Sequence, residues 1–183
     1  GMMASVFASK ERIEPYLAKQ ASLEIAAYNG PNNHVLSGPA TTLEPLLAQM
    51  SSDGIRTEPL KIAFAAHCML VEPIMERFRS AAQKIQFGKA SIPIVSNLDG
   101  DFTTTDEIAT PDHWVSHLRQ PVRFADGVRT LIESGITHFI EIGPHPVLSA
   151  MALDTRENTD PLRQPAFLAS LRRDGEPGLE LTS

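Results

Sequence analysis

The strongest constraint on the fold is the order of elements in the first 61 residues, where short apolar runs alternate with helix-like segments. Two turn-like stretches separate them, residues 29–33 and Asp53-Gly54, because glycine and asparagine tolerate positive φ and proline stops a strand. Thr41 is the expected N-cap of the second helix. Strands are predicted at residues 3–8, 23–28, 34–37 and 55–60, and helices at 10–20 and 41–52.

The order βαββαβ is that of the ferredoxin-like split unit, a compact module that can be inserted in a larger fold. We therefore expect residues 1–61 to form a small subdomain. The rest of the chain predicts an α/β layer, because buried strands of the parallel-sheet type alternate with helices. Strands are expected at residues 92–96, 138–142 and 167–171, and helices at 72–86, 111–118, 124–134 and from Val147.

Composition excludes several classes of protein. The net charge of -6 leaves no basic face for a phosphate backbone, so nucleic-acid binding is not expected. A single cysteine, Cys68, excludes an internal disulfide. No run approaches about 18 apolar residues and no signal peptide is recognisable, so a cytoplasmic protein without a membrane segment is expected. Residues 174–183 have the composition of a linker or tail.

Six histidines are the candidates for chemistry, and most histidines in proteins are structural or solvated. His113 and His117 have the i,i+4 spacing that can hold a metal on a helix face, but no carboxylate at a recognised spacing completes a site. We therefore expect no metal. The six are His34, His67, His113, His117, His138 and His145.

His67 differs from the others in its setting, because an apolar run ends there and a helix is predicted to begin. A histidine at the mouth of such a loop can be held by one ring nitrogen and act as a general base, although spacing alone favours a packed or capping role. Cys68 is a tempting nucleophile, but adjacent side chains seldom face each other, and a buried structural cysteine is favoured. The 183 residues contain no GxSxG elbow.

Several strings in this order resemble the acyltransferase domain of modular type I polyketide synthases and, more distantly, the malonyl-CoA:carrier-protein transacylases. They are AAYNGPNNHVLSGP (26–39), AAHCMLVEPI (65–74), IPIVSNLDG (92–100), HWVSHLRQPVRFADGV (113–128), EIGPHPVLSAM (141–151) and SLRR (170–173). The resemblance implies a ferredoxin-like subdomain at 1–61, followed at 62–173 by the C-terminal part of an α/β-hydrolase-like acyltransferase core. The chain would then be the C-terminal two-thirds of such a domain.

The resemblance also implies site residues and partners. His67 matches the catalytic histidine, and His117 matches a position whose backbone carbonyl orients the imidazole. Asn29 and Asn97 match asparagines near the cleft. The family's serine, in a GHSxG elbow, has no counterpart here. Implied substrates are acyl-CoA and the phosphopantetheine of an acyl carrier protein, with no cofactor bound by the chain itself. Implied partners are the carrier protein, the remainder of the domain and the neighbouring ketosynthase.

The tetrapeptide before and including the histidine is the family's specificity marker. Malonyl-selective domains resemble HAFH there and methylmalonyl-selective domains resemble YASH, whereas this chain has Phe64, Ala65 and Ala66 before His67. A phenylalanine in the third position would crowd an α-substituent, and Ala66 leaves room. We therefore expect a substituted extender such as methylmalonyl in preference to malonyl.

Two other functions remain open on the sequence alone. Without the serine the chain could be a catalytically inactive fragment or scaffold piece of the same family, and an α/β protein of another function could share the scaffold. The isolated chain is expected to be inactive, to expose apolar surface and to be poorly soluble.

Overall fold

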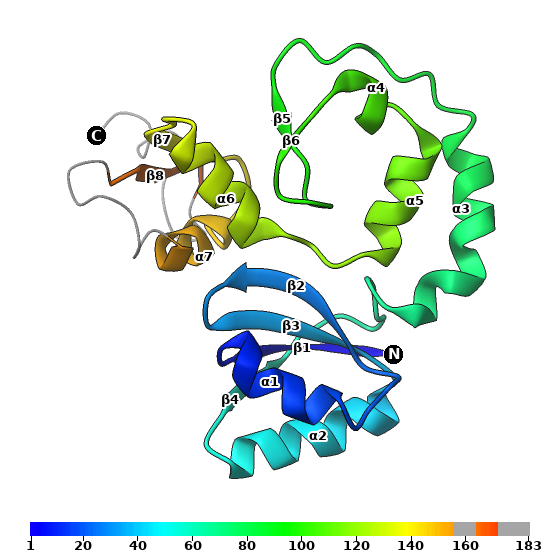
Figure 1. Cartoon of the computed structure of the whole chain (residues 1–183), viewed down its shortest axis with the longest axis vertical. Coiled ribbons are helices and arrows are strands. Elements are labelled where there is room, and N and C mark those ends of the chain that lie inside the picture. The colour runs from blue at the N-terminus through cyan, green and yellow to red at the C-terminus, as the bar shows by residue number, and fades with distance from the viewer. Residues whose placement is uncertain (156–163, 172–183) are drawn as a thin grey trace.

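A computed structural model describes residues 1–155 and 164–171 of the chain (Figure 1). Its first part is a four-stranded antiparallel sheet with strand order β2-β3-β1-β4. The βαββαβ order predicted from the sequence is therefore present, with most boundaries shifted by one to three residues. The elements are β1 (Met2–Phe7), α1 (Lys10–Leu17), β2 (Glu24–Gly30), β3 (Asn33–Gly38), α2 (Ala40–Ser52) and β4 (Arg56–Pro59).

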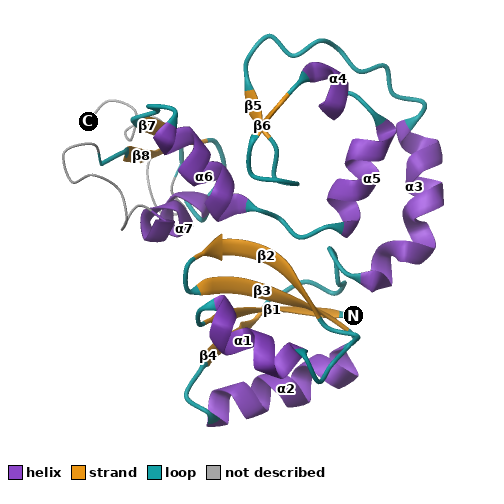
Figure 2. Cartoon of the chain, viewed as in Figure 1, coloured by secondary structure: helices purple, strands orange, loops and turns teal. Residues whose placement is uncertain are grey.

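Helices α1 and α2 cover one face of this sheet (Figure 2). Alternation along β1 sends Ala4 and Val6 to that face, where both are fully buried. Helix α2 begins at Ala40 with Pro39 as its N-cap, so the prediction that Thr41 caps it was wrong. The apolar cluster between the helices and the sheet includes Ile13, Leu36, Leu43, Leu46, Leu47, Met50 and Ile55.

The opposite face of the sheet carries a second, smaller apolar cluster. Met3, Ala26 and Val35 contribute to it from three different strands. Ala65 and Cys68, which come from the chain after β4, pack against them. The segment around His67 is therefore anchored on the face of the sheet that the two helices leave uncovered.

The chain from α3 through β5, β6 and α4 back to α5 follows an open loop, and α6, α7, β7 and β8 gather at the other end (Figure 1). Backbone hydrogen bonds from Val122 to Ala26 and from Tyr28 to Val122 join this part to the β2 edge of the sheet. The elements are a 3-10 helix η1 (Met69–Ile74), α3 (Met75–Ala82), β5 (Ile94–Val95), β6 (Phe102–Thr103), α4 (Thr105–Ile108), α5 (Pro111–Arg119), α6 (Phe124–Glu133), β7 (His138–Glu141), α7 (Leu148–Thr155) and β8 (Ala166–Ala169).

Two strands differ from their predicted environment. The strand expected at 92–96 is reduced to β5, which pairs antiparallel with β6, and Ile92 is 75% exposed. Strand β7 is parallel to β8, as predicted, but Ile140 on it is 58% exposed. An apolar run predicts burial only where other elements cover both faces, and β7 pairs with β8 alone among the described residues.

Exposed apolar side chains are distributed very unevenly along the chain. Every exposed large apolar side chain in the part that the structure describes lies at or after Ile62, and examples include Ile74, Phe78 and Ile85 on the face predicted for the helix at 72–86. That helix is divided into η1 and α3. The expected exposure of apolar surface is thus confirmed for these residues, whereas poor solubility stays a prediction.

The predicted linker at 174–183 and Arg172-Arg173 lie outside the described residues. Within the described ranges, no helix has the length and apolar character to cross a bilayer.

His34 is a buried histidine of the first part, on β3. It is 3% exposed, and its Nδ1–H donates to the Ala8 carbonyl over 3.0 Å. Burial lowers the pKa of His34, and the hydrogen bond to Ala8 and the charge of Glu11 oppose this shift. The folded chain therefore holds His34 neutral at a pH where the unfolded chain would protonate it.

This burial predicts a loss of stability in weak acid. Because the folded pKa is below the unfolded value of about 6.5, stability is fully present above that pH and falls as the pH drops towards the folded pKa. His34→Asn should reduce the slope of the unfolding free energy against pH between pH 6.5 and 5. One histidine contributes at most about 1.4 kcal/mol per pH unit to this slope. Urea titrations at several pH values measure it. An unchanged slope would exclude His34 as the cause, and His138→Asn, at an exposed histidine on β7, is the matched control.

Candidate active site

The backbone of His67 has an unusual conformation. Its φ is +56°, which makes it the one non-glycine residue with positive φ among the described residues. For residues other than glycine such a conformation costs about 1–3 kcal/mol, and it persists only where the surroundings enforce it. The neighbours do so here, since Ala65 and Cys68 are buried while His67 is half-exposed.

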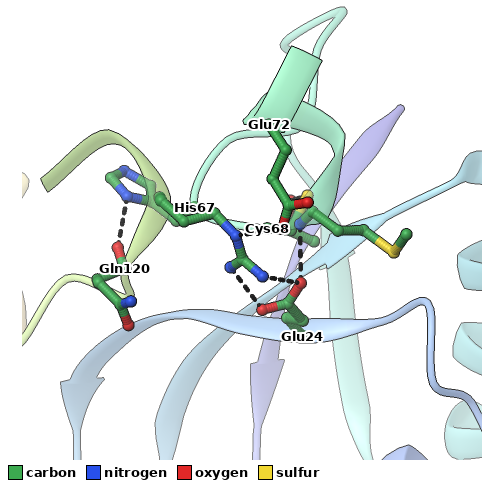
Figure 3. A network of polar contacts seen from close by, with 8 residues as sticks. Glu24, His67, Cys68, Glu72 and Gln120 are labelled. Atoms are coloured by element: carbon green, nitrogen blue, oxygen red, sulfur yellow. Dashed lines mark hydrogen bonds and ion pairs between the residues drawn. The ribbon is translucent and has the colours of Figure 1, made fainter. Parts of the chain in front are cut away.

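The imidazole of His67 is held by one nitrogen (Figure 3). Its Nδ1 lies 2.8 Å from the backbone carbonyl oxygen of Gln120. A carbonyl only accepts hydrogen bonds, so Nδ1 carries the proton and Nε2 of the neutral ring keeps its lone pair. No described residue forms a hydrogen bond with Nε2. This is the tautomer that a general base needs.

The orienting carbonyl belongs to Gln120, so the assignment of this role to His117 was wrong. His117 lies inside the last turn of α5, whereas Gln120 is its C-cap with ψ of 155°. Pro121 follows Gln120, and a residue before proline is driven out of the α region. The Gln120 carbonyl therefore leaves the helix direction and can face His67. Pro121 was the signal in the sequence that could have identified Gln120.

The imidazole ring of His117 packs edge-to-face against the ring of His67. The two ring centroids are 5.9 Å apart with the planes nearly perpendicular, and His113 stacks on His117 at 6.5 Å. Burial lowers the pKa of His117, and the charges of His67 and His113 lower it further. A neutral imidazole therefore borders His67. Nowhere in the described ranges do three or more histidine, cysteine, aspartate or glutamate side chains form a group that could hold a metal ion.

An ion-pair network lies directly beside this histidine. Arg119 on α5 donates to both carboxylate oxygens of Glu24 on β2, at 2.7 and 3.1 Å, and through Nε to Glu72 at 2.9 Å. Glu24 also accepts the backbone N–H of Met69 at 2.8 Å. The sequence analysis missed this network, because residues 24 and 119 are 95 positions apart and no spacing rule connects them.

The residues before His67 have different exposures. Phe64 is 60% exposed, Ala65 is buried, and Ala66 is half-buried with its N–H 3.4 Å from the Met3 sulfur. Cys68 is fully buried and its sulfur lies 3.4 Å from the Ser37 hydroxyl. A thiol without access to solvent is unsuited to attack a substrate, which supports a structural role for Cys68.

The two asparagines lie near the segment that follows Gln120. Asn29 is buried on β2, next to Tyr28, whose N–H donates to Val122. The Asn97 carbonyl accepts the Arg123 N–H at 2.8 Å. Among the described contacts, neither side chain forms a hydrogen bond with His67. Their place in a cleft stays a prediction.

A sizeable cleft lies elsewhere, on the first part of the fold and α6. It has a volume of about 800 Å³ between α1, β2 and α6, and its lining includes Lys10, His34, Arg123 and Arg129 but not His67. Asp126 pairs with both arginines, so the cleft has mixed charge. The imidazole that is held at one nitrogen and open at the other, that of His67, therefore lies outside this cleft.

An imidazole that is fixed by a carbonyl through one nitrogen and open at the other has the geometry that a general base needs to activate a nucleophile. Comparison with known proteins gives the family. The chain belongs to the acyl transferase domain family, whose model matches residues 1–181.

Relatives and solved structures agree with this family. The chain is 35% identical over 187 residues to the polyketide synthase GfsB of Streptomyces halstedii, covering 100% of the chain and 3% of the synthase. It is 37% identical to the acyltransferase domain from the second module of the salinomycin polyketide synthase, with a TM-score of 0.84 over 95% of the chain and 40% of that domain.

A third comparison is with the acyl transferase domain of SpnD, solved in complex with 2-(pent-4-yn-1-yl)malonyl. It is 28% identical, with a TM-score of 0.88 over 98% of the chain and 43% of that domain. The chain thus spans 40% and 43% of these two solved domains and 3% of the GfsB synthase. Its α/β fold is that of polyketide synthase acyltransferase domains.

Proposed function

We propose that this chain forms the histidine-bearing part of an acyltransferase that loads an extender unit from acyl-CoA onto the phosphopantetheine thiol of an acyl carrier protein in polyketide biosynthesis. The observation that carries the proposal is the His67 ring, fixed at Nδ1 by the Gln120 carbonyl with Nε2 free to take a proton. The match of residues 1–181 to the acyl transferase family supports it.

The chemistry needs a hydroxyl nucleophile, which we assign to a serine outside these 183 residues. Nε2 of His67 removes the hydroxyl proton as the serine oxygen attacks the thioester carbonyl. The C–S bond then breaks, and the protonated ring returns the proton to the departing CoA thiol. The same steps with the carrier-protein thiol transfer the acyl group and regenerate the serine. The reaction requires no further cofactor.

Two observations support a nucleophile that comes from another segment. The chain has no GxSxG elbow, and Cys68 is fully buried. The exposed apolar side chains from Ile62 onward offer a surface on which the remainder of an α/β-hydrolase-like core can pack. We propose that this remainder, the carrier protein and a neighbouring ketosynthase are its partners.

For the extender unit we propose a substituted malonyl group such as methylmalonyl. Ala66 precedes His67, and its small side chain leaves volume beside the base that a phenylalanine would fill. The SpnD domain, a structural relative, was solved with a malonyl group that carries a long α-substituent. One methyl group in a pocket is worth about 1–3 kcal/mol, so the preference is expected to be graded.

A hybrid domain tests the proposal. In it, this chain replaces the matching 40% of the salinomycin second-module domain. The remaining part of that domain is expected to contribute the serine. The hybrid, mixed with malonyl-CoA and methylmalonyl-CoA together, should gain the methylmalonyl mass in intact-mass spectra. Ala66→Phe should shift the ratio of the two adducts towards malonyl about 10-fold or more, because the ring occupies the space of the methyl group.

Ala66→Ser is the matched control, since it adds one hydroxyl and should keep the methylmalonyl preference. Thermal denaturation by circular dichroism confirms that each hybrid is folded. Equal malonyl and methylmalonyl adducts on the unchanged hybrid would contradict the extender assignment. A folded hybrid that gains no acyl group would favour the inactive-scaffold alternative.

A further inference from the structure

Arg119 and Glu24 form the most extensively connected ion pair near His67. The guanidinium and the carboxylate meet through two hydrogen bonds, and their side chains are only 23% and 30% exposed. The hydrogen bonds to Glu24 raise the pKa of Arg119, so the guanidinium stays charged. A two-point contact of this kind fixes orientation as well as distance.

The pair connects the two segments that determine the position of the imidazole. Arg119 directly precedes Gln120, whose carbonyl holds Nδ1 of His67. Glu24 binds the N–H of Met69, two residues after His67. A single carboxylate on β2 therefore holds both the acceptor of the His67 hydrogen bond and the chain that carries the ring (Figure 3).

His67 needs such support because of its backbone. A φ of +56° is costly for a histidine, and the ring leaves this position if the chain relaxes. Cys68, directly after His67, is anchored by burial against the sheet. The Arg119–Glu24 pair acts one residue further along, at Met69, where η1 begins and the side chains are exposed.

We propose that Arg119 and Glu24 are positioning residues, which hold the strained His67 backbone and the Gln120 carbonyl in the geometry of the base. This inference rests on the proposed function for its effect on rate. Its effect on the His67 ring can be measured without catalysis, because the Nδ1–H and Nε2–H tautomers of histidine differ in their ¹⁵N shifts.

Glu24→Gln is the sharpest variant. It retains an oxygen for the Met69 N–H but removes the charge and one of the oxygens that Arg119 binds. In the hybrid domain it should lower kcat for acyl transfer about 10- to 100-fold with KM nearly unchanged, because misplacing a base by about 1 Å has an effect of that size. The His67 signal should lose its Nδ1–H character, in ¹⁵N-histidine spectra of both the hybrid and the 183-residue chain.

Glu58→Gln is the matched control, because Glu58 pairs with Arg56 on β4, at the opposite edge of the same sheet. It should change neither the tautomer nor kcat. The inference is overturned if Glu24→Gln lowers stability but leaves the His67 tautomer and kcat as they were. A different result is that Glu24→Gln shifts the His67 tautomer while acyl transfer by the hybrid does not depend on His67. That result would reject the proposed function and keep the positioning role.

Discussion

Replacing His67 by alanine in the hybrid domain should slow acyl transfer to the carrier protein by about 10²- to 10⁴-fold, the range that general acid–base catalysis supplies. The substitution removes the ring that the Gln120 carbonyl orients. The serine then keeps its proton during attack, and the departing thiolate finds no acid. Stopped-flow release of CoA measures the first step, and intact-mass spectra of the carrier protein measure the second.

The control for this variant is His138→Ala. His138 is an exposed histidine on β7 whose ring contacts only the neighbouring Thr137 hydroxyl among the described hydrogen bonds. Its loss should leave the rate within about twofold, since surface substitutions rarely act at a distance. If His67→Ala transfers acyl groups as fast as His138→Ala, His67 is not the base and the mechanism proposed for this chain is wrong.

The first part of the fold could be predicted from the sequence because its signals are local. The short apolar runs of β1 and β2, helical spacing in α2 and the Asp53-Gly54 turn each act within a few residues. Gly54 indeed has a φ of +75°. In the second part, β7 and β8 lie close to where strands were predicted, but β5 is shorter than predicted and β6 was missed. The burial of β5 and β7 was also not predicted correctly. Burial of β5 and β7 depends on which elements cover them, and a local pattern carries no information about that.

The site was predictable to different degrees for different residues. His67 was indicated by the resemblance and not by its spacing, and its positive φ was invisible in the sequence. Gln120 was missed although Pro121 marks where the helix must end. The Arg119–Glu24 pair could not be predicted, because it joins β2 to α5 only after the chain has folded. Polar contacts over such separations follow from topology and not from composition.

Leu43→Ala is expected to have the largest effect on stability. Leu43 on α2 is 0% exposed and packs in the cluster between the helices and the sheet. Removing a buried leucine side chain costs about 2–5 kcal/mol, through lost burial and the cavity left behind. Folded domains are stable by about 5–15 kcal/mol, so the change removes a large share of the total. Urea unfolding of the chain, followed by circular dichroism, measures it.

Leu153→Ala on α7 is the matched control, because the same side chain is removed from a helix where it is 39% exposed. Its cost should be below about 1 kcal/mol, since little burial is lost and alanine favours a helix. If Leu43→Ala lowers the unfolding free energy much more than Leu153→Ala does, the stability of this chain comes mainly from the sheet and its two helices. We expect this result because the segment from Ile62 leaves many apolar side chains exposed. Similar losses would show instead that α7 is stabilised by apolar packing comparable to that of α2. The surface after Ile62 would then be less available to the partner segment that the proposed function requires.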